Sequence, residues 1–492
     1  CIDTWIGRSM MDPEEVTIAE HLSAAGYSTG IFGKWHLGDC YPMRPMDQGF
    51  QESLVLNGGG LAQPSEPREN NARYTDPILF RNGQQEQTKG YCADVYFREA
   101  INFIGDSVST QRPFFVYIPS NTPHGPFHDV PEDLRKQYAA EPDKLASIAK
   151  EPVNDGVIDR LARIGAMVTN VDHNVGRLLD ALDDLKIADN TIVIYLVDNG
   201  PNSWRYVGNR RGMKTGVNEG GVRSPFWIRW PNRLKAGTVS EKLSAHIDVL
   251  PTIAAACNVD ISNGPKIDGR NLLPLLDGSK NIDWPERTIA IQTHRGDVPT
   301  RYHHFMIRDS RWKLLHASGF GNERFSGEPT FELFDVLDDP TESKNVIASH
   351  PDEFSRLRDA YDKWFDDVSS TRPDNYAPPR IHLGHDGIDS TMLTRQDWRA
   401  PSWSDKHIGH WEVHVEKELA ADVRVLITPV DRAEEVALAI GDQVVRGESS
   451  PNDDEVLLKG VRMLAGDARI RVTLSSNGMQ RGPHQVIVEN VK

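Results

Sequence analysis

Residues 26–39 read GYSTGIFGKWHLGD, and this stretch decides the fold. Its β-rich part ends in a glycine, after which Lys34 and His36 follow within three residues. The pattern predicts a strand that delivers these two cationic or proton-handling side chains to its carboxyl end. Upstream, Asp12 predicts the N-cap of a helix and Gly26 predicts its end. We therefore expect a helix followed by a strand with polar groups at its end.

Composition limits the partners that this chain can have. The 492 residues include 55 basic and 71 acidic side chains, which gives a net charge of −16. This charge argues against a nucleic-acid partner, so an anionic substrate must be held by a local cluster of cations. The longest purely apolar run, residues 192–197, is far shorter than the roughly 18 residues of a spanning helix. We expect no membrane span.

Strand and helix signals alternate over the first two-thirds of the chain. Residues 114–118 and 191–197 are apolar runs of strand length, and apolar residues recur at helical spacing over 158–182. This alternation predicts an α/β fold with a parallel sheet covered by helices on both faces. After about residue 285, short strands at 305–308 and 312–315 flank a two-residue turn and predict a small antiparallel sheet.

A third region follows a proline-rich break at residues 376–380. Residues 410–415, 423–427 and 469–474 alternate with period two and predict a β-sandwich-like region. We therefore expect three parts: an α/β domain at 1–285, an antiparallel subdomain at 286–375 and an accessory β-rich domain at 376–492.

Three polar clusters come shortly after predicted strands. The first is Lys34 with His36, the second contains His124, and the third is Asp198 with Asn199. In open α/β sheets, ligands bind outside the carboxyl ends of the strands. The clusters therefore predict one active site, and we expect the glycine-rich loop at residues 56–61 to line it.

The segment around Lys34 closely resembles the second signature of the sulfatases, the sulfate-ester hydrolases of the alkaline-phosphatase superfamily. Matching motifs continue at residues 198–200, 211–225 and 246–252, and the likeness covers roughly residues 5–370. The resemblance implies an alkaline-phosphatase-like fold, an arylsulfatase-like activity and a periplasmic or secreted location. It also assigns the site residues: catalytic Lys34, His36, His124 and Lys214, and metal-binding Asp198 and Asn199.

The chemistry of a sulfate monoester explains this set of residues. Its charged oxygens need fixed cations, a hard metal ion and an acid for the departing oxygen. Lys34 and Lys214 supply charge, and His124 or Lys214 can protonate the leaving oxygen. The oxygens of Asp198 and Asn199 suit Ca²⁺ or Mg²⁺ far better than zinc, and we expect Ca²⁺ rather than Mg²⁺. The expected substrate is a sulfated small molecule or a sulfated glycan.

Sulfatases also carry an upstream Asp-Asp metal pair and a Cys-x-Pro-x-Arg segment whose Cys becomes formylglycine, the nucleophile. Neither element is among the 33 residues before Lys34. We therefore expect an amino-terminally truncated chain that is inactive as given and a formylglycine upstream of it. Residues 40–44 match Cys-x-Pro-x-Arg but follow Lys34, so we interpret Cys40 as a surface or half-buried thiol. Cys1 has neither the Pro nor the Arg.

Two other classes of function stay open. The same fold can hydrolyse phosphoesters or phosphonates, although that chemistry needs His and Asp clusters for transition metals. A non-catalytic glycan-binding protein would hold sugar on Trp398, Trp403 and Trp411. We expect His303 and His304 to lie in a solvated turn.

Overall fold

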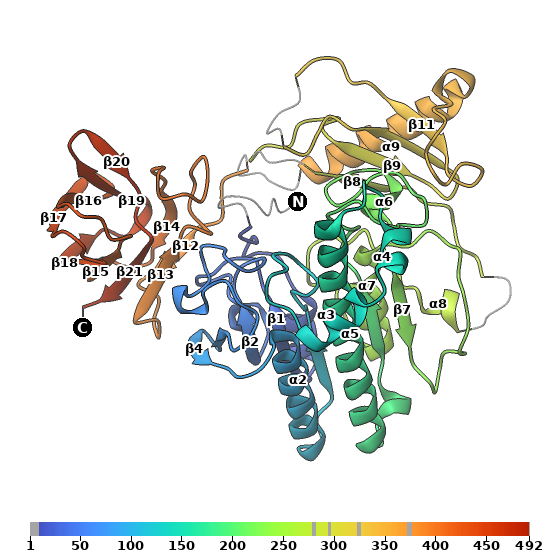
Figure 1. The fold of residues 1–492 in the computed structure, drawn as a ribbon, viewed down its shortest axis with the longest axis horizontal. Helices are drawn as coiled ribbons and strands as arrows, with labels where there is room; N and C mark the ends of the chain where they lie inside the picture. Colours follow the sequence, from blue (N-terminus) through green and yellow to red (C-terminus); the bar gives the residue numbers. More distant parts are fainter. Residues whose placement is uncertain (1–8, 278–281, 294–296, 322–325, 371–375, 492) are drawn as a thin grey trace. The chain divides into compact units, whose positions relative to one another are not determined.

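The computed structural model describes residues 9–277, 282–293, 297–321, 326–370 and 376–491. The chain forms two compact units, each built from separate stretches of sequence. The first unit comprises residues 1–131, 167–174 and 378–492, and the second comprises residues 132–166 and 175–377. Helix α5 (Asp155–Asp184) contributes residues to both units. Figure 1 shows the chain coloured from blue at the amino end to red at the carboxyl end.

The strand expected before Lys34 is β1 (Ser28–Lys34), and all of its residues except Lys34 are buried. It lies inside a sheet with the strand order β4-β3-β2-β1-β5. Its two neighbours, β2 (Glu52–Leu56) and β5 (Phe114–Tyr117), run parallel to it. Beyond β2 the sheet continues with β3 (Ile78–Arg81) and β4 (Gln84–Gln87), each antiparallel to the strand before it. Apolar and small residues along β1 allow its burial on both faces. The strand predicted from residues 26–39 is confirmed.

The helix before β1 begins later than Asp12, where the sequence analysis placed its N-cap. Helix α1 spans Ile18–Ala24 and is capped by Thr17, whose Oγ1 accepts from Glu20 N at 3.1 Å while Thr17 N donates to Glu20 Oε2 at 2.7 Å. Asp12 instead accepts a hydrogen bond from the backbone two residues later. A capping box satisfies two amide groups at once, so it outweighs the single Asp signal. Gly26 follows the helix with φ +90°, as predicted.

Helices α2 (Cys92–Ser109) and α5 provide the core beside this sheet. The ring of Phe103 on α2 lies 5.8 Å from the ring of Phe32 on β1. Met167 of α5 is fully buried in the same cluster. The helical spacing predicted over residues 158–182 is confirmed by α5, which extends beyond it at both ends.

The second apolar run, at residues 191–197, pairs differently from the prediction. It forms β6 (Val193–Leu196), which pairs antiparallel with β7 (Phe226–Arg229) in the second unit. Among the described residues, β6 has no other partner strand. Leu196 is 40% exposed and Trp227 is 61% exposed. An apolar run alone predicts a strand that is buried on both faces of a sheet. The strand β6 is instead partly exposed to solvent.

The antiparallel sheet predicted after residue 285 is confirmed. Its strand order is β11-β10-β9-β8, with bounds β8 (Ile289–Gln292), β9 (Phe305–Arg308), β10 (Trp312–His316) and β11 (Glu332–Asp335). Helix α9 (Pro351–Ser369) packs on it, and the ring of its Tyr361 lies 4.0 Å from that of Phe305. The β9–β10 turn has three residues rather than two, because Asp309 Oδ1 accepts from the backbone N of Arg311 and Trp312.

Shorter helices connect these elements. The α-helices are α3 (Glu132–Ala139), α4 (Pro142–Ile148), α6 (Glu219–Val222), α7 (Val249–Cys257) and α8 (Leu273–Leu276). Short 3-10 turns lie at Pro45–Gln48, Arg68–Asn70, Ala188–Asn190, His246–Asp248 and Ile347–Ser349. No helix in the described ranges combines the length and apolar character needed to cross a bilayer.

The carboxyl-terminal strands form two sheets, as the period-two pattern predicted; they are drawn in orange and red in Figure 1. One has β12 (Ile381–Leu383), β14 (Trp411–Val415), β19 (Gly466–Ser476), β16 (Glu434–Ile440) and β17 (Gln443–Ser449), with β20 (Met479–Arg481) beside β19. The other has β13 (Ser390–Thr394), β21 (Gln485–Asn490), β15 (Leu419–Leu426) and β18 (Glu455–Met463). Their buried cluster also contains Trp35 and Met43, so this region shares a core with the segment after β1.

Candidate active site

The segment after β1 is fixed by its tryptophan. Trp35 is buried, its Nε1 donates to Met43 O at 2.8 Å, and its ring packs edge-on against Phe50 at 6.1 Å. The backbone N of Lys34 donates to Pro119 O at 2.7 Å. These contacts hold the backbone at the carboxyl end of β1, and they leave Lys34 and His36 half-buried.

Two histidines far apart in sequence lie against consecutive glycines. A Cβ added at Gly59 would lie 2.4 Å from Nδ1 of His36, and one at Gly60 would lie 2.9 Å from Nδ1 of His124. His36 has φ +60°, and its backbone N donates to Asn57 O at 2.8 Å. Each of these two consecutive glycines after β2 therefore leaves room for one imidazole, which gives the loop predicted to line the site a specific physical role.

The proton position on His124 follows from its neighbours. Nδ1 of His124 lies 2.7 Å from Gly125 O, and a carbonyl only accepts, so Nδ1 carries the proton. The buried Tyr74 donates its hydroxyl to His124 O at 2.9 Å. Nε2 is therefore the nitrogen of His124 that gains and loses a proton.

Two polar residues that the sequence analysis missed hold the glycine loop. Gln63 Oε1 accepts from the backbone N of Gly59 at 2.6 Å, and the carboxylate of Glu66 accepts from the backbone N of Ala62. Burial raises the pKa of Glu66 to about 7. Neither residue belongs to a recognisable motif, so only the fold reveals them.

The other predicted residues lie in the second unit, where β6 ends. Asn199 N donates to Asp198 Oδ1 at 2.9 Å, and Gly200 N donates to Gly221 O at 2.9 Å. The backbone N of Lys214 donates to Pro201 O at 2.7 Å. The loop of Asp198 and Asn199 therefore lies beside the loop of Lys214.

A buried ion-pair network supports the Lys214 loop and was not predicted. Glu219, at the start of α6, contacts Lys313 Nζ at 3.0 Å and Arg308 Nη1 at 2.9 Å. Lys313 is fully buried and also contacts Glu342 at 2.9 Å. Burial alone would raise the pKa of Glu219, but the cations of Lys313 and Arg308 outweigh it and lower that pKa.

The six predicted residues thus form two groups. Lys34, His36 and His124 belong to the first unit. Asp198, Asn199 and Lys214 belong to the second. Their convergence in one pocket stays a prediction.

The predicted metal ligands in the second unit provide only part of the coordination that a hard cation needs. Asp198 and Asn199 offer a carboxylate and an amide oxygen, whereas Ca²⁺ takes six to eight oxygen ligands. Within the described parts of the chain, no group of three or more His, Cys, Asp or Glu side chains is placed to hold a metal ion. Any Ca²⁺ at this position needs further ligands.

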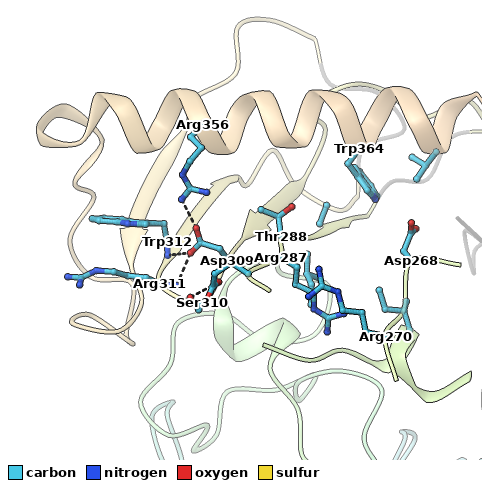
Figure 2. Close-up of a pocket in the computed structure, with 15 residues that line it drawn as sticks. Asp268, Arg270, Arg287, Thr288, Asp309, Ser310, Arg311, Trp312, Arg356 and Trp364 are labelled. Atoms are coloured by element: carbon cyan, nitrogen blue, oxygen red, sulfur yellow. Dashed lines mark hydrogen bonds and ion pairs between the residues drawn. The ribbon is translucent and has the colours of Figure 1, made fainter. Parts of the chain in front are cut away.

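A cavity of about 1030 Å³ in the second unit has none of the predicted site residues in its wall. Its arginines already have partners: Arg356 of α9 reaches Asp309, as Figure 2 shows, and Arg287 pairs with the buried Asp248. Arg270 donates to Pro285 O at 2.6 Å. The guanidinium groups of these three arginines are therefore already engaged in contacts within the protein.

Cys40 is more deeply buried than predicted. It is 4% exposed rather than at the surface, and its Sγ donates to Met392 O at 3.2 Å. Burial raises the pKa of the Cys40 thiol, and the carboxyls of Asp397 and Asp39 raise it further. Because the thiolate is the reactive form, this environment disfavours Cys40 as a nucleophile. Cys1 lies outside the described residues.

The structure rules out the sugar-binding role considered for Trp398 and Trp411 and contradicts the solvated turn expected at His303 and His304. Trp398 and Trp411 are fully buried, and their Nε1 groups donate to Ser402 O and Thr394 O, so neither can stack on a sugar. Trp403 is half-buried. His303 and His304 are buried rather than solvated, and Nε2 of His304 lies 2.7 Å from Thr215 O. Ser402, close to Trp398 in sequence, and Thr215, far from His304, are among the residues that contact these side chains.

Comparison with known proteins gives the family. The Sulfatase family profile matches residues 10–259, and a second profile, described as N-sulphoglucosamine sulphohydrolase, C-terminal, matches residues 213–363. The chain belongs to the sulfatase family. It is 32% identical to N-acetylgalactosamine-6-sulfatase of Canis lupus familiaris, over 58% of this chain and 52% of that protein. It is 31% identical to human arylsulfatase A, over 68% of this chain and 67% of the relative.

Solved structures show the same fold. BT4656 in complex with its substrate D-glucosamine-2-N,6-O-disulfate has a TM-score of 0.56 and 21% identity, covering 75% of this chain and 85% of that one. The PsFucS1 sulfatase from Pseudoalteromonas sp. has a TM-score of 0.55 and 19% identity, covering 77% and 80%. The fold is the alkaline-phosphatase-like α/β fold with added antiparallel sheets. The chain spans about half the length of the N-acetylgalactosamine-6-sulfatases that it matches.

Proposed function

We propose that this chain carries the catalytic domain of an arylsulfatase-like sulfuric ester hydrolase. The observation that carries the proposal is the pair of histidines held against Gly59 and Gly60 beside the carboxyl end of β1. Two imidazoles and a lysine at a sheet edge suit an ester whose charged oxygens must be bound while protons move. Family membership favours sulfate over phosphate as the transferred group.

Each residue has a proposed role. Lys34 and Lys214 bind sulfate oxygens through charge-assisted hydrogen bonds. His124 or Lys214 protonates the leaving oxygen, and His36 handles a proton at the nucleophile. For His124 the acid is Nε2, because Nδ1 donates to Gly125 O.

The proposal includes a metal ion and a modified residue. Asp198 and Asn199 would hold one Ca²⁺ together with ligands outside this pair. Bound there, the ion would neutralise charge on the sulfate oxygens. The nucleophile is assigned to a formylglycine outside residues 1–492.

The substrate class is a sulfated small molecule or a sulfated glycan. Two similar proteins support the glycan: an N-acetylglucosamine-6-O-sulfatase of Bacteroides thetaiotaomicron, 24% identical over 69% of this chain, and BT4656 with its disulfated glucosamine. Such substrates fit a periplasmic or secreted enzyme, which is the location that we propose.

The test is hydrolysis of a chromogenic aryl sulfate and of sulfated amino sugars by the full-length protein, produced in a host that installs formylglycine. His124→Ala and Lys214→Ala should each lower kcat by roughly 10²-fold or more. His128→Ala, four residues beyond His124, is the matched control and should retain activity. Faster turnover of phosphate esters with transition metals than of sulfate esters would contradict the proposal.

A further inference from the structure

A side chain from the carboxyl-terminal strands touches a proposed catalytic histidine. Nε2 of Gln396 lies 3.1 Å from Nε2 of His36, 360 positions away in sequence. Gln396 follows β13 and is 1% exposed. The two family profiles end at residues 259 and 363, so neither includes this glutamine.

We propose that Gln396 is a positioning residue for His36: its amide orients the imidazole and selects which ring nitrogen carries the proton. The inference rests on the proposed function, because His36 is catalytic only within it. It also assigns a role to the carboxyl-terminal region, which supplies part of the wall behind the histidine.

Hydrogen bonds connect the loop that carries Gln396 to the segment after His36. Asp39 N donates to Asp397 Oδ2 at 2.9 Å, and Thr394 Oγ1 donates to Asp39 Oδ2 at 2.8 Å. The backbone N of Gln396 donates to Thr394 Oγ1 at 3.2 Å. These bonds act within three residues of His36, so they fix the amide relative to the ring.

The opposite side of the ring is closed as well. Gly59 lies so close to Nδ1 and Cε1 of His36 that a Cβ would overlap them. The His36 ring is therefore held between a glycine backbone on one side and a buried amide at Nε2. A ring confined in this way has few alternative orientations.

The amide can serve both protonation states of His36. As placed, the NH₂ group of Gln396 donates to Nε2, so the ring proton is on Nδ1. Oε1 of Gln396 is buried and has no hydrogen-bond partner among the described residues. When the ring takes up a second proton, at Nε2, the amide has to turn by 180° so that Oε1 accepts from that nitrogen.

Gln396→Met tests the role, because it keeps the length of the side chain and removes the amide. In the full-length enzyme we expect kcat to fall roughly 10-fold to 100-fold with little change in KM, as for other residues that orient a reacting group. Gln443→Met is the control: Gln443 belongs to β17 of the same carboxyl-terminal sheets, and β17 pairs with β16 rather than with the segment of Gln396. It should leave kcat unchanged.

A second variant separates positioning from folding. In Gln396→Glu a carboxylate faces the imidazole and stabilises its charged form, so the pH profile of kcat should move to higher pH. The ¹⁵N resonances of His36 should report the same shift, and in Gln396→Met they should show mixed tautomers. Wild-type kcat and an unshifted profile in both variants would overturn the proposal.

The spectroscopic measurement needs no turnover. If the wild-type protein hydrolyses no sulfate ester, the proposed function fails, while the ¹⁵N spectrum still reports whether Gln396 sets the tautomer of His36. Identical His36 spectra in the wild type and Gln396→Met would overturn the positioning role by itself.

Discussion

The two groups of site residues differ in how the protein supports them. Lys34 ends β1 and His36 comes two residues later; β1 is flanked by β2 and β5, and all of its residues before Lys34 are buried. Asp198 and Asn199 follow β6, which pairs with β7 alone among the described residues and exposes Leu196. The first group is held by its sheet and a glycine loop, whereas the second depends on backbone contacts and a buried ion-pair network. The same polar pattern after an apolar run is therefore supported by different contacts in each unit.

The largest effect should come from breaking the network behind the second group. Lys313→Met would leave Glu219 and Glu342 as buried carboxylates without their shared cation. We expect a loss of about 3–5 kcal/mol in unfolding free energy, since removing one partner of a buried pair strands the other. Denaturant unfolding measures it. Lys363→Met on α9 is the control, and equal stability of both variants would contradict the role of Lys313.

The group of Lys34, His36 and His124 should be most sensitive to substitution in the glycine loop. Gly59→Ala would push a methyl group into the His36 ring, so we expect kcat to fall on the order of 10²-fold with smaller effects on stability. Gly105→Ala on α2 is the control, because a Cβ there has no heavy atom within 4 Å. Activity of Gly59→Ala close to the wild type would show that the ring position is not critical.

Metal binding sharpens the comparison further. With only Asp198 and Asn199 as assigned ligands, residues 1–492 should bind Ca²⁺ weakly, with a Kd of about 10⁻⁴–10⁻³ M. Asp198→Ala should weaken binding roughly 10-fold, whereas Asp189→Ala, before β6, should not. Calorimetry decides this, and tight binding that is insensitive to Asp198→Ala would refute the assignment.

The smallest effect concerns pH and the loop of Gln396. Burial raises the pKa of Asp39, the charge of Asp397 raises it further, and burial also raises the pKa of Asp397. A carboxyl with a raised pKa favours the folded state below its unfolded pKa and loses that contribution as pH rises through the folded pKa. Between pH 5 and 7.5, Asp397→Asn should therefore lose about 1 kcal/mol less stability than the wild type.

Thermal unfolding of both proteins at several pH values measures this difference. Asp389→Asn, just before β13, is the control and should follow the wild type. Parallel curves for the wild type and Asp397→Asn would show that the buried pair does not titrate in this range.

The sequence pattern was sufficient to predict an element where a single local rule determines it. β1, α5 and the carboxyl-terminal strands follow from hydrophobic period and length, and the motifs around Lys34 and Asp198 identified the family. Competition between local signals was harder to predict: the Thr17 capping box displaced the start expected at Asp12. The exposure of single side chains was predicted less well. Cys40, Trp398 and His304 look like surface residues in the sequence, but distant segments cover them in the structure.

The sequence by itself determined the strand before Lys34, the helical and β-rich regions and the residue types of the candidate site, because each depends on spacing along the chain. Only the tertiary structure decided that Gly59 and Gly60 hold two histidines, that Lys313 supports the Lys214 loop, and that Gln396 reaches His36. These contacts join residues separated by tens to hundreds of positions. Their energies depend on burial and distance, which no local pattern encodes.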